Sequence, residues 1–155
     1  MTLRLVALGH RMPAWVSAGY DEYARRMPRD APLALVELKP EPRDRGKTVA
    51  QILAAEALRL DAACAGSMIV ALDERGSPWN TRELAANLQQ WRLAHDHLSF
   101  VIGSADGLDP AFRRRAAARF SLSALTLPHG LVRVLVAEQL YRATSLAAGH
   151  PYHRD

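Results

Sequence analysis

The fold class of this 155-residue chain is decided by one stretch, LSFVIGSADGLDP, which covers residues 98–110. Its first part, Leu98–Ile102, is continuously apolar, as expected of a strand that is covered on both faces. The glycine-bearing turn Gly103–Gly107 follows, and Asp109 with Pro110 then supplies an N-cap and first-turn pair for a helix. A buried strand that leads through a turn into a helix is typical of a parallel α/β sheet.

The rest of the chain repeats this alternation of strands and helices. Further strands are expected at Leu3–Leu8, Leu33–Leu38 and Met68–Leu72, while Leu122–Leu127 is compatible with strand or loop. Further helices are expected at Trp15–Met27, from Thr48 to near Gly66, from Asn80 to about Ala94, after Pro110 with Arg113, Arg114, Arg115 and Arg119 on it, and at Leu131–Ala148. We therefore predict an α/β fold in which helices cover both faces of a mostly parallel sheet, as one domain over residues 1–155.

Two of these helices carry further expectations. In the first helix, Trp15, Ala18 and Tyr23 are the candidate inward-facing residues. The last helix, Leu131–Ala148, is apolar around much of its circumference, so it must be buried on more than one side. In a chain this small, one of those sides is a candidate dimer interface. Ligands of parallel α/β folds bind at the carboxyl ends of the strands, which points to the turns after Leu72 and Ile102.

The charge balance leaves nucleic-acid binding open. The formal net charge is +4 and the pI is about 9.7, and all the cationic side chains except Lys39 and Lys47 are arginines. Arginine suits phosphate because its planar fork donates two parallel hydrogen bonds. Solvated arginine-rich helix faces explain the same numbers equally well, so charge alone does not decide between the two readings.

The single cysteine and the apolar runs limit the compartment. Cys64 cannot form an internal disulfide, and no Cys/His cluster has the spacing of zinc ligands, so Cys64 is expected to be a small buried residue near a helix end. No apolar run reaches the roughly 18–20 residues of a membrane span. The run Leu3–Leu8 is too short for a signal peptide. The prediction is a cytoplasmic protein without a metal ion or a membrane anchor.

Two glycine-bearing segments can be compared with phosphate-binding motifs, and neither matches. The segment Gly46-Lys47-Thr48 looks like the end of a P-loop, but that motif requires glycine where this chain has Glu41. The turn Gly103–Gly107 lacks the G-x-G-x-x-G spacing of a dinucleotide site. A plain strand-to-helix turn and a turn that approaches a ligand both remain compatible with it.

Histidines and the C-terminal tail are the remaining candidates for chemistry. His129, His150 and His153 could exchange protons near neutral pH, although a capping or surface role is the commoner use of such residues. The tail that ends in Tyr152, His153 and Arg154 offers a ring that can stack on a base and a guanidinium that can hold a phosphate. An ordinary polar tail is the alternative interpretation.

Short segments spread over the whole chain carry a resemblance to a known family. They are Leu3–Gly9, Ile69–Asp73 with Gly76, Phe100–Gly103 with Gly107, Ser121–His129, and finally Arg133, Glu138, Gln139, Tyr141, Arg142 and His150–Arg154. Together they are similar to the bacterial 23S ribosomal RNA pseudouridine N3-methyltransferases, small members of the knotted SPOUT methyltransferases. One departure is visible: where the family usually has a second glycine after the isoleucine, this chain has Ser104, which we expect to tune cofactor binding and not to abolish it.

The resemblance implies a cofactor, a topology and an assembly. It implies S-adenosylmethionine as methyl donor, with no metal ion, and a deep C-terminal trefoil knot. It also implies a homodimer that methylates 23S rRNA in the assembled ribosome. The residues implied to bind the cofactor are Leu72, Gly103, Leu122, Ser123, Ala124, Leu125, Thr126 and Leu127. Backbone groups of such segments can hold an adenine edge while apolar side chains hold its faces.

The resemblance also implies where catalysis takes place. Tyr152, His153 and Arg154 are expected to contact the target nucleotide, with Arg142 and His129 in support. The N3 imide must lose its proton before it can accept a methyl group, and His153 is the first candidate for the base, with Glu138 the second. Two other classes of function stay open: a non-catalytic ribosome-binding module on the same fold, and a flavodoxin-like nucleotide-binding protein, for which the tail would have no use.

Overall fold

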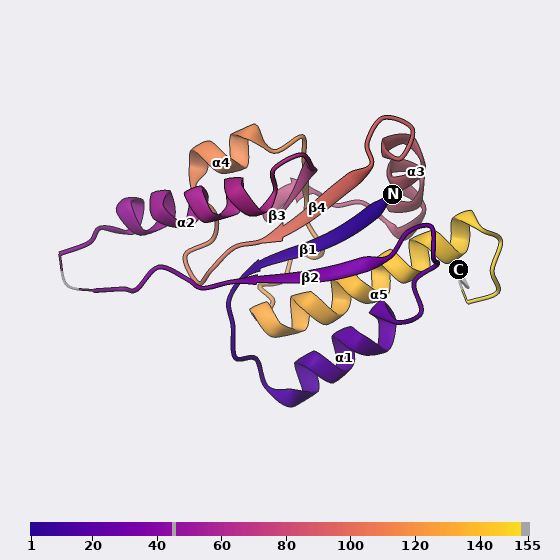
Figure 1. Ribbon diagram of the computed structural model, residues 1–155, viewed down its shortest axis with the longest axis horizontal. Helices are drawn as coiled ribbons and strands as arrows, with labels where there is room; N and C mark the ends of the chain where they lie inside the picture. Colours follow the sequence, from indigo (N-terminus) through magenta and orange to yellow (C-terminus); the bar gives the residue numbers. More distant parts are fainter. Residues whose placement is uncertain (45, 153–155) are drawn as a thin grey trace.

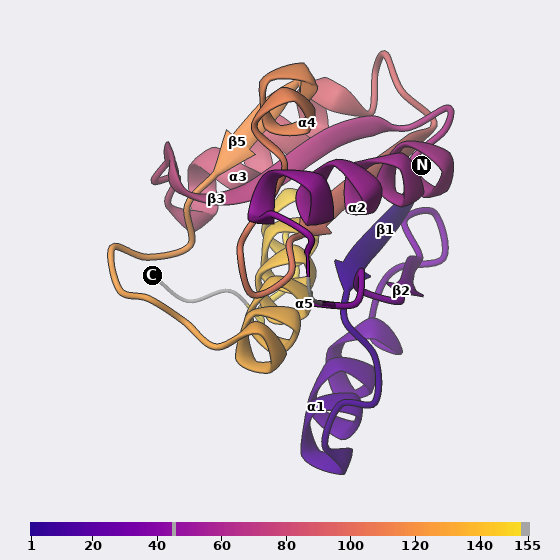
Figure 2. The ribbon, with the colours of Figure 1, turned by 90° about the vertical axis from the view of Figure 1, so that its left-hand side faces the viewer.

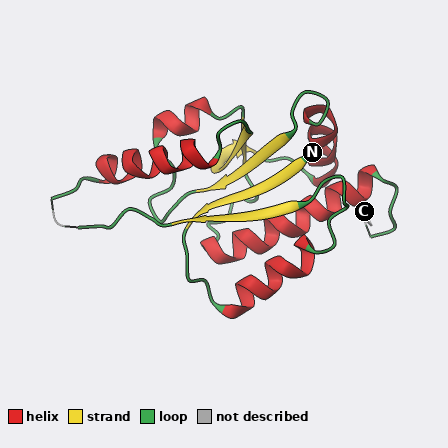
Figure 3. Cartoon of the chain, viewed as in Figure 1, coloured by secondary structure: helices red, strands yellow, loops and turns green. Residues whose placement is uncertain are grey.

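Five strands and five helices alternate along the chain, and the computed structural model describes residues 1–44 and 46–152 (Figure 3). The strands are β1 (Thr2–Leu8), β2 (Leu33–Leu38), β3 (Met68–Ser77), β4 (His97–Ile102) and β5 (Ala118–Phe120). The helices are α1 (Ala14–Ala24), α2 (Val49–Ala63), α3 (Thr81–Trp91), α4 (Pro110–Arg115) and α5 (His129–Ala147). None of the described helices is long and apolar enough to cross a membrane.

All strand pairs are parallel, in the order β2-β1-β4-β3-β5. The register pairs Leu5 with Phe100 and Val70 with Phe100, so these three side chains share one face of the sheet. Because every strand runs in the same direction, all carboxyl ends lie at one edge, and the chain must cross back over a face after each strand. The predicted parallel sheet is therefore confirmed. The trefoil knot stays a prediction.

Each face of the sheet has its own core (Figures 1 and 2). On one face, α1, α3 and α5 pack over side chains such as Leu5 and Phe100. On the other, α2 and α4 cover a smaller cluster that includes Val101, Phe112 and Cys64. Cys64 is the C-cap residue of α2 and is buried, as expected. The prediction of helices on both faces is confirmed.

Local sequence signals set most of the helix starts. Thr48 forms a complete capping box with Gln51 at the start of α2, and Asn80 forms one with Glu83 at the start of α3. Asp109 caps α4 by accepting a hydrogen bond from the Phe112 N–H at 3.0 Å. These side chains satisfy backbone donors that the first turn leaves without a partner.

Two details of the sequence interpretation are wrong, and it contains no prediction of β5. Trp15 and Ala18 face solvent, with Trp15 57% exposed, and Val16 and Tyr20 are the buried residues of α1 instead. Arg119 is not on a helix, because α4 ends at Arg115 and Arg119 lies in β5. The short strand β5 has too few residues to show a period of its own, and Leu122–Leu127, which was compatible with strand or loop, is a loop.

Candidate functional site

A cavity of about 440 Å³ opens at the carboxyl ends of β3, β4 and β5. Three segments that are far apart in the chain form its walls: the residues that follow Leu72, the turn Gly103–Gly107, and the loop between β5 and α5. The volume falls within the roughly 300–1,000 Å³ of cofactor pockets. Its position is the one predicted for a ligand of a parallel sheet.

The turn after β4 is tight because Gly103 has no side chain. A Cβ added there would lie 2.5 Å from the Gly107 carbonyl oxygen, which is closer than real contacts allow. Gly107 has a φ of +82°, in the left-handed region that glycine adopts without strain. The Gly107 N–H donates to the Ser104 carbonyl at 2.9 Å and closes the turn. The two glycines therefore allow the tight turn whose residues Gly103–Gly107 line the cavity.

The loop between β5 and α5 is held by its own hydroxyl groups. Ser121 donates to the carbonyl of Ser123 at 3.1 Å, and the Ser123 hydroxyl accepts from the Leu125 N–H at 2.9 Å. Leu125 remains exposed at the mouth of the cavity. The loop therefore presents backbone groups and apolar side chains together, which suits a flat aromatic ligand with polar edges.

His129 joins the last helix to the turn after β4. Its Nδ1 lies 3.1 Å from the Gly103 carbonyl oxygen, and its Nε2 lies 3.0 Å from Nε of Arg133. A carbonyl can only accept and a guanidinium can only donate, so Nδ1 carries the proton and Nε2 is the acceptor. Burial and the neighbouring Arg133 charge lower the pKa of His129 from its ordinary 6.5. The ring is neutral at pH 7 with both nitrogens engaged, so it positions the turn and does not exchange protons.

Arg133 anchors this arrangement from inside the protein. It is 1% exposed, donates to the Gly9 carbonyl at 2.8 Å and pairs with Glu37 at 2.7 Å. A buried charge is tolerated only when it is paired and hydrogen-bonded, and Arg133 meets both conditions. Through Arg133, the ends of β1 and β2 are connected to the wall of the cavity.

A charged pair forms another part of the wall. Asp73 follows Leu72 at the end of the buried part of β3, and its Oδ2 lies 3.7 Å from Nε of Arg113 on α4. That oxygen is buried and makes no hydrogen bond among the described residues, whereas Oδ1 accepts from the Arg75 N–H. The wall thus offers a carboxylate acceptor to a ligand that carries hydroxyl or amino groups.

Comparisons with known proteins agree with this geometry. The family model described as "Predicted SPOUT methyltransferase" matches residues 1–153. The chain is 55% identical to the "Ribosomal RNA large subunit methyltransferase H" of Nitrosospira multiformis and 51% identical to that of Burkholderia multivorans, in both cases over 99% of each protein.

The chain belongs to the SPOUT methyltransferase family.

Solved structures agree on the fold. A probable methylase family protein of Haemophilus influenzae superposes with a TM-score of 0.57 at 16% identity, over 99% of this chain and 70% of that one. The tRNA (m1G37) methyltransferase of Aquifex aeolicus superposes with a TM-score of 0.56 at 11% identity, over 92% of this chain and 69% of that one. At such identities the likeness concerns the fold alone.

Most of the residues that the SPOUT resemblance assigned to the cofactor lie around the cavity. Seven of the eight line it: Leu72, Gly103, Leu122, Ser123, Leu125, Thr126 and Leu127. The eighth, Ala124, is exposed in the same loop and is not among the lining residues. The structure therefore brings together the turns after Leu72 and Ile102, to which the sheet topology pointed, and the loop Leu122–Leu127, which only the resemblance connected with them.

The residues predicted for catalysis do not lie together in one chain. His129 lines the cavity, whereas Arg142 and Tyr152 lie near the other end of α5 (Figure 1). The 13 residues between His129 and Arg142 correspond to about 20 Å along a helix. His153 and Arg154 lie outside the described residues.

Arg142 and Tyr152 form a compact cluster with Glu138. Arg142 Nε donates to Glu138 at 2.8 Å, and its guanidinium carbon lies 4.9 Å from the centroid of the Tyr152 ring. The Tyr152 hydroxyl donates to Glu138 at 3.2 Å, and its ring packs on Tyr141 at 4.5 Å. Burial and the Glu138 carboxylate raise the pKa of Tyr152 to about 12, so its hydroxyl stays protonated at neutral pH.

Several residues of the site escaped the sequence interpretation. Arg133 was noted only through the resemblance, although its position four residues after His129 places both on one helical face. Glu56 was not singled out, yet it falls on the buried stripe of α2 between Ile52 and Leu60, where a charge signals a buried partner. No sequence signal pointed to Arg43, because its partners are distant in the chain.

Proposed function

We propose that the chain is an S-adenosylmethionine-dependent methyltransferase that modifies N3 of a pseudouridine in 23S rRNA of assembled ribosomes. It acts as a homodimer of one domain, residues 1–155, in the cytoplasm. The observation that carries the proposal is the cavity at the strand ends, where the turn Gly103–Gly107 and the loop after β5 meet. Relatives that are named for methylation of large-subunit ribosomal RNA, at 51–55% identity, support the substrate class.

The residues around the cavity fit the proposed cofactor. Gly103 lets the turn that lines the cavity close tightly on Gly107, and apolar side chains such as Leu122 and Leu127 can cover the faces of an adenine ring. Asp73 offers an acceptor for hydroxyl or amino groups. The described residues contain no group of three or more His, Cys, Asp or Glu side chains that could hold a metal ion.

Positioning is the main task of these residues. S-adenosylmethionine supplies a sulfonium-bound methyl group that leaves by in-line displacement. The protein must therefore align the acceptor nitrogen, the methyl carbon and the sulfur, which is an entropic contribution to the rate. His129 and Arg133 serve this task because they fix the carbonyl of Gly103. Neither residue needs to gain or lose a proton.

The proton of the acceptor nitrogen must leave by another route. Tyr152 is protonated at neutral pH and cannot serve as the base. Glu138 is ionisable but already accepts hydrogen bonds from Arg142, Gln139 and Tyr152, as expected of a structural partner. His153 remains the first candidate for the base, as the sequence resemblance implies.

The separation of the two catalytic groups supports the homodimer. In one chain, Arg142 lies about 20 Å along α5 from His129 at the cavity, and Tyr152 packs against Arg142. A two-fold axis near the middle of α5 would place the far end of one helix beside the near end of its copy. The tail of one protomer would then contact a nucleotide whose methyl donor is bound by the other.

A non-catalytic ribosome-binding module on the same fold is the second candidate function. Such a module would have the same fold, but it would not need a cavity lined by seven of the predicted cofactor residues. The test is methyl transfer from labelled S-adenosylmethionine to naked 23S rRNA, separate subunits and joined ribosomes, with the modified nucleotide mapped afterwards. We expect label at one pseudouridine, with the most label on joined ribosomes. Ribosome binding without any transfer of label would favour the non-catalytic module.

A further inference from the structure

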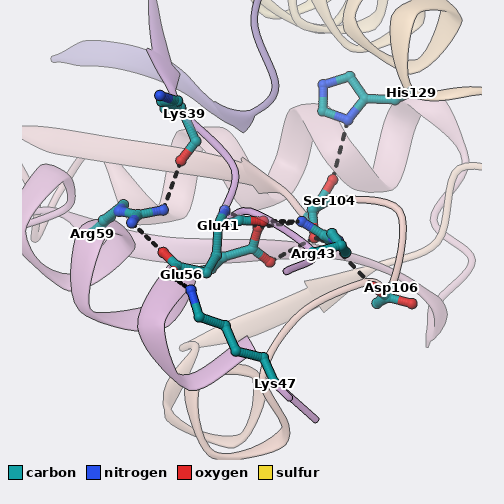
Figure 4. Close-up of polar contacts among 10 residues, drawn as sticks. Lys39, Glu41, Arg43, Lys47, Glu56, Arg59, Ser104, Asp106 and His129 are labelled. Carbon is teal, nitrogen blue, oxygen red and sulfur yellow. Dashed lines mark hydrogen bonds and ion pairs between the residues drawn. The ribbon is translucent and has the colours of Figure 1, made fainter. Parts of the chain in front are cut away.

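A network of charged residues contacts the turn Gly103–Gly107 through Ser104 and Asp106 (Figure 4). Its centre is Glu56 of α2, which is 1% exposed. The carboxylate accepts hydrogen bonds from the Ser104 hydroxyl at 2.6 Å, from the Glu41 N–H at 3.1 Å and from Arg43 Nη1 at 3.2 Å. Three donors on one buried carboxylate compensate for the loss of water.

Arg43 connects this buried centre to the turn. Its Nη1 bonds Glu56, while its Nη2 donates to the Ser104 hydroxyl at 2.9 Å and to Oδ2 of Asp106 at 3.0 Å. Ser104 and Asp106 line the cavity, whereas Arg43 does not. Arg43 therefore reaches the methyl-donor site only through the residues that it holds.

Arg43 and the side chains that it bonds come from three separate parts of the chain. Arg43 belongs to the connection between β2 and α2, Glu56 belongs to α2, and Ser104 and Asp106 belong to the turn after β4. We call these four residues the Arg43 clamp. The same turn is held from its other side by His129, which bonds the Gly103 carbonyl (Figure 4). The turn is thus fixed between two independent sets of contacts.

We propose that Arg43 is a positioning residue for methyl-donor binding, because it fixes Ser104 and Asp106 in the cavity wall. The inference rests on the proposed function and deepens it. Ser104 stands where the resembled family usually has glycine, and its hydroxyl accepts from Arg43 and donates to Glu56. The departure from glycine thus adds a contact to the wall.

A general effect on stability would have a different signature. The Arg43 side chain is 36% exposed, so its pair with the equally exposed Asp106 contributes little to folding, whereas its other partner, Glu56, is 1% exposed. Removing the arginine leaves the Glu56 carboxylate with its other two donors. The expected consequence is a looser turn in a folded protein, and therefore a weaker methyl-donor site.

The matched control is Lys47, whose side chain is also 36% exposed. It pairs with Glu41 in the same connection but makes no contact with the turn after β4 in the described structure. Lys47→Gln removes one positive charge from the connection, as Arg43→Gln does. A difference between the two variants therefore reports the contact with the turn and not the charge.

Titration calorimetry of the full chain with S-adenosylmethionine tests the inference. We expect Arg43→Gln to raise the Kd about five- to tenfold, as for a coupling of typical size, and Lys47→Gln to leave it unchanged. Arg43→Lys should recover only part of the affinity, because one ammonium cannot reproduce the planar fork. On saturating methyl donor, kcat of Arg43→Gln should stay within about twofold of wild type.

The outcomes separate the two proposals. A wild-type chain that binds no S-adenosylmethionine would overturn the proposed function and this inference together. Normal binding by wild type and unchanged Kd in Arg43→Gln would overturn the inference alone, as would a lowered Tm with an unchanged Kd.

Ser104→Ala gives a second, independent readout because it retains every trypsin site. If Arg43 favours binding of the methyl donor, bound methyl donor should in turn hold Arg43 in place, because coupling is reciprocal. S-adenosylmethionine should therefore slow trypsin cleavage of the connection between β2 and α2 several-fold in wild type. The protection should be weaker in Ser104→Ala. Equal protection in both proteins would contradict the proposal that the Arg43 clamp supports methyl-donor binding, even if Arg43→Gln fails to fold.

Discussion

At the scale of residues, two buried charges that support the cavity wall are fully hydrogen-bonded. Arg133 and Glu56 are each 1% exposed, and each has at least three hydrogen-bond partners. Sequence reasoning could predict Leu72 and Gly103 as wall residues by resemblance, but not the contacts of Arg43. Those contacts depend on side chains that only the folded chain brings together.

The protonation of His129 leads to a pH prediction. Burial, followed by the Arg133 charge, lowers the pKa of His129 below its unfolded value of about 6.5. In mildly acidic solution, the unfolded chain then binds more protons than the folded chain. The stability that the neutral His129 ring contributes is therefore complete above pH 6.5 and is lost as pH falls through the folded pKa.

Urea unfolding between pH 7.5 and 5 measures this effect. The free energy of unfolding should fall on acidification in wild type, and by less in His129→Gln, which lacks the titrating ring. Calorimetric affinity for S-adenosylmethionine should weaken over the same range. Parallel pH profiles for the two proteins would show that His129 does not titrate in this way.

At the scale of elements, periodicity and caps predicted most boundaries, and packing decided the rest. The capping boxes at Thr48 and Asn80 were read correctly because they involve neighbours in sequence. Trp15 was misplaced because α1 turns Val16 and Tyr20 toward α5 and the sheet. The strand β5 was missed because only its pairing with β3 defines it.

The tail that follows α5 is the element with the clearest catalytic prediction. Deletion of residues 152–155 should reduce single-turnover methylation of ribosomes by at least 100-fold, because the residues proposed to hold the nucleotide are lost. The cost in stability should be about 1–2 kcal/mol, since Tyr152 packs on Tyr141 and donates to Glu138 but the segment is otherwise a chain terminus. Circular dichroism and sedimentation provide the control for fold and assembly. Methylation at a near-normal rate would identify the tail as an ordinary polar end.

At the scale of the whole molecule, a parallel sheet with two cores leaves a face of α5 partly exposed. Leu131, Leu135, Glu138 and Arg142 recur at spacings of four, three and four residues, so they lie on one side of the helix. Val136 is buried in the core of its own chain and is therefore a poor probe of an interface. The partly exposed stripe is the better candidate for contact with a second copy.

Leu135→Glu should convert the proposed homodimer to monomer, because it places a charge in that stripe without entering the core. Leu58→Glu is the matched control, since Leu58 is 72% exposed on α2, on the opposite face of the sheet. Sedimentation velocity at micromolar concentration distinguishes the two states. A wild-type monomer, or equal behaviour of the two variants, would argue against dimerisation through α5.

Binding of the methyl donor is the measurement that tests the account most directly. Wild-type protein should be titrated calorimetrically with S-adenosylmethionine, with and without a metal chelator, and then with the demethylated product as competitor. The cavity at the strand ends predicts one site per chain, unaffected by the chelator and blocked by the product. No heat of binding at millimolar cofactor, or binding that the chelator abolishes, would contradict the account.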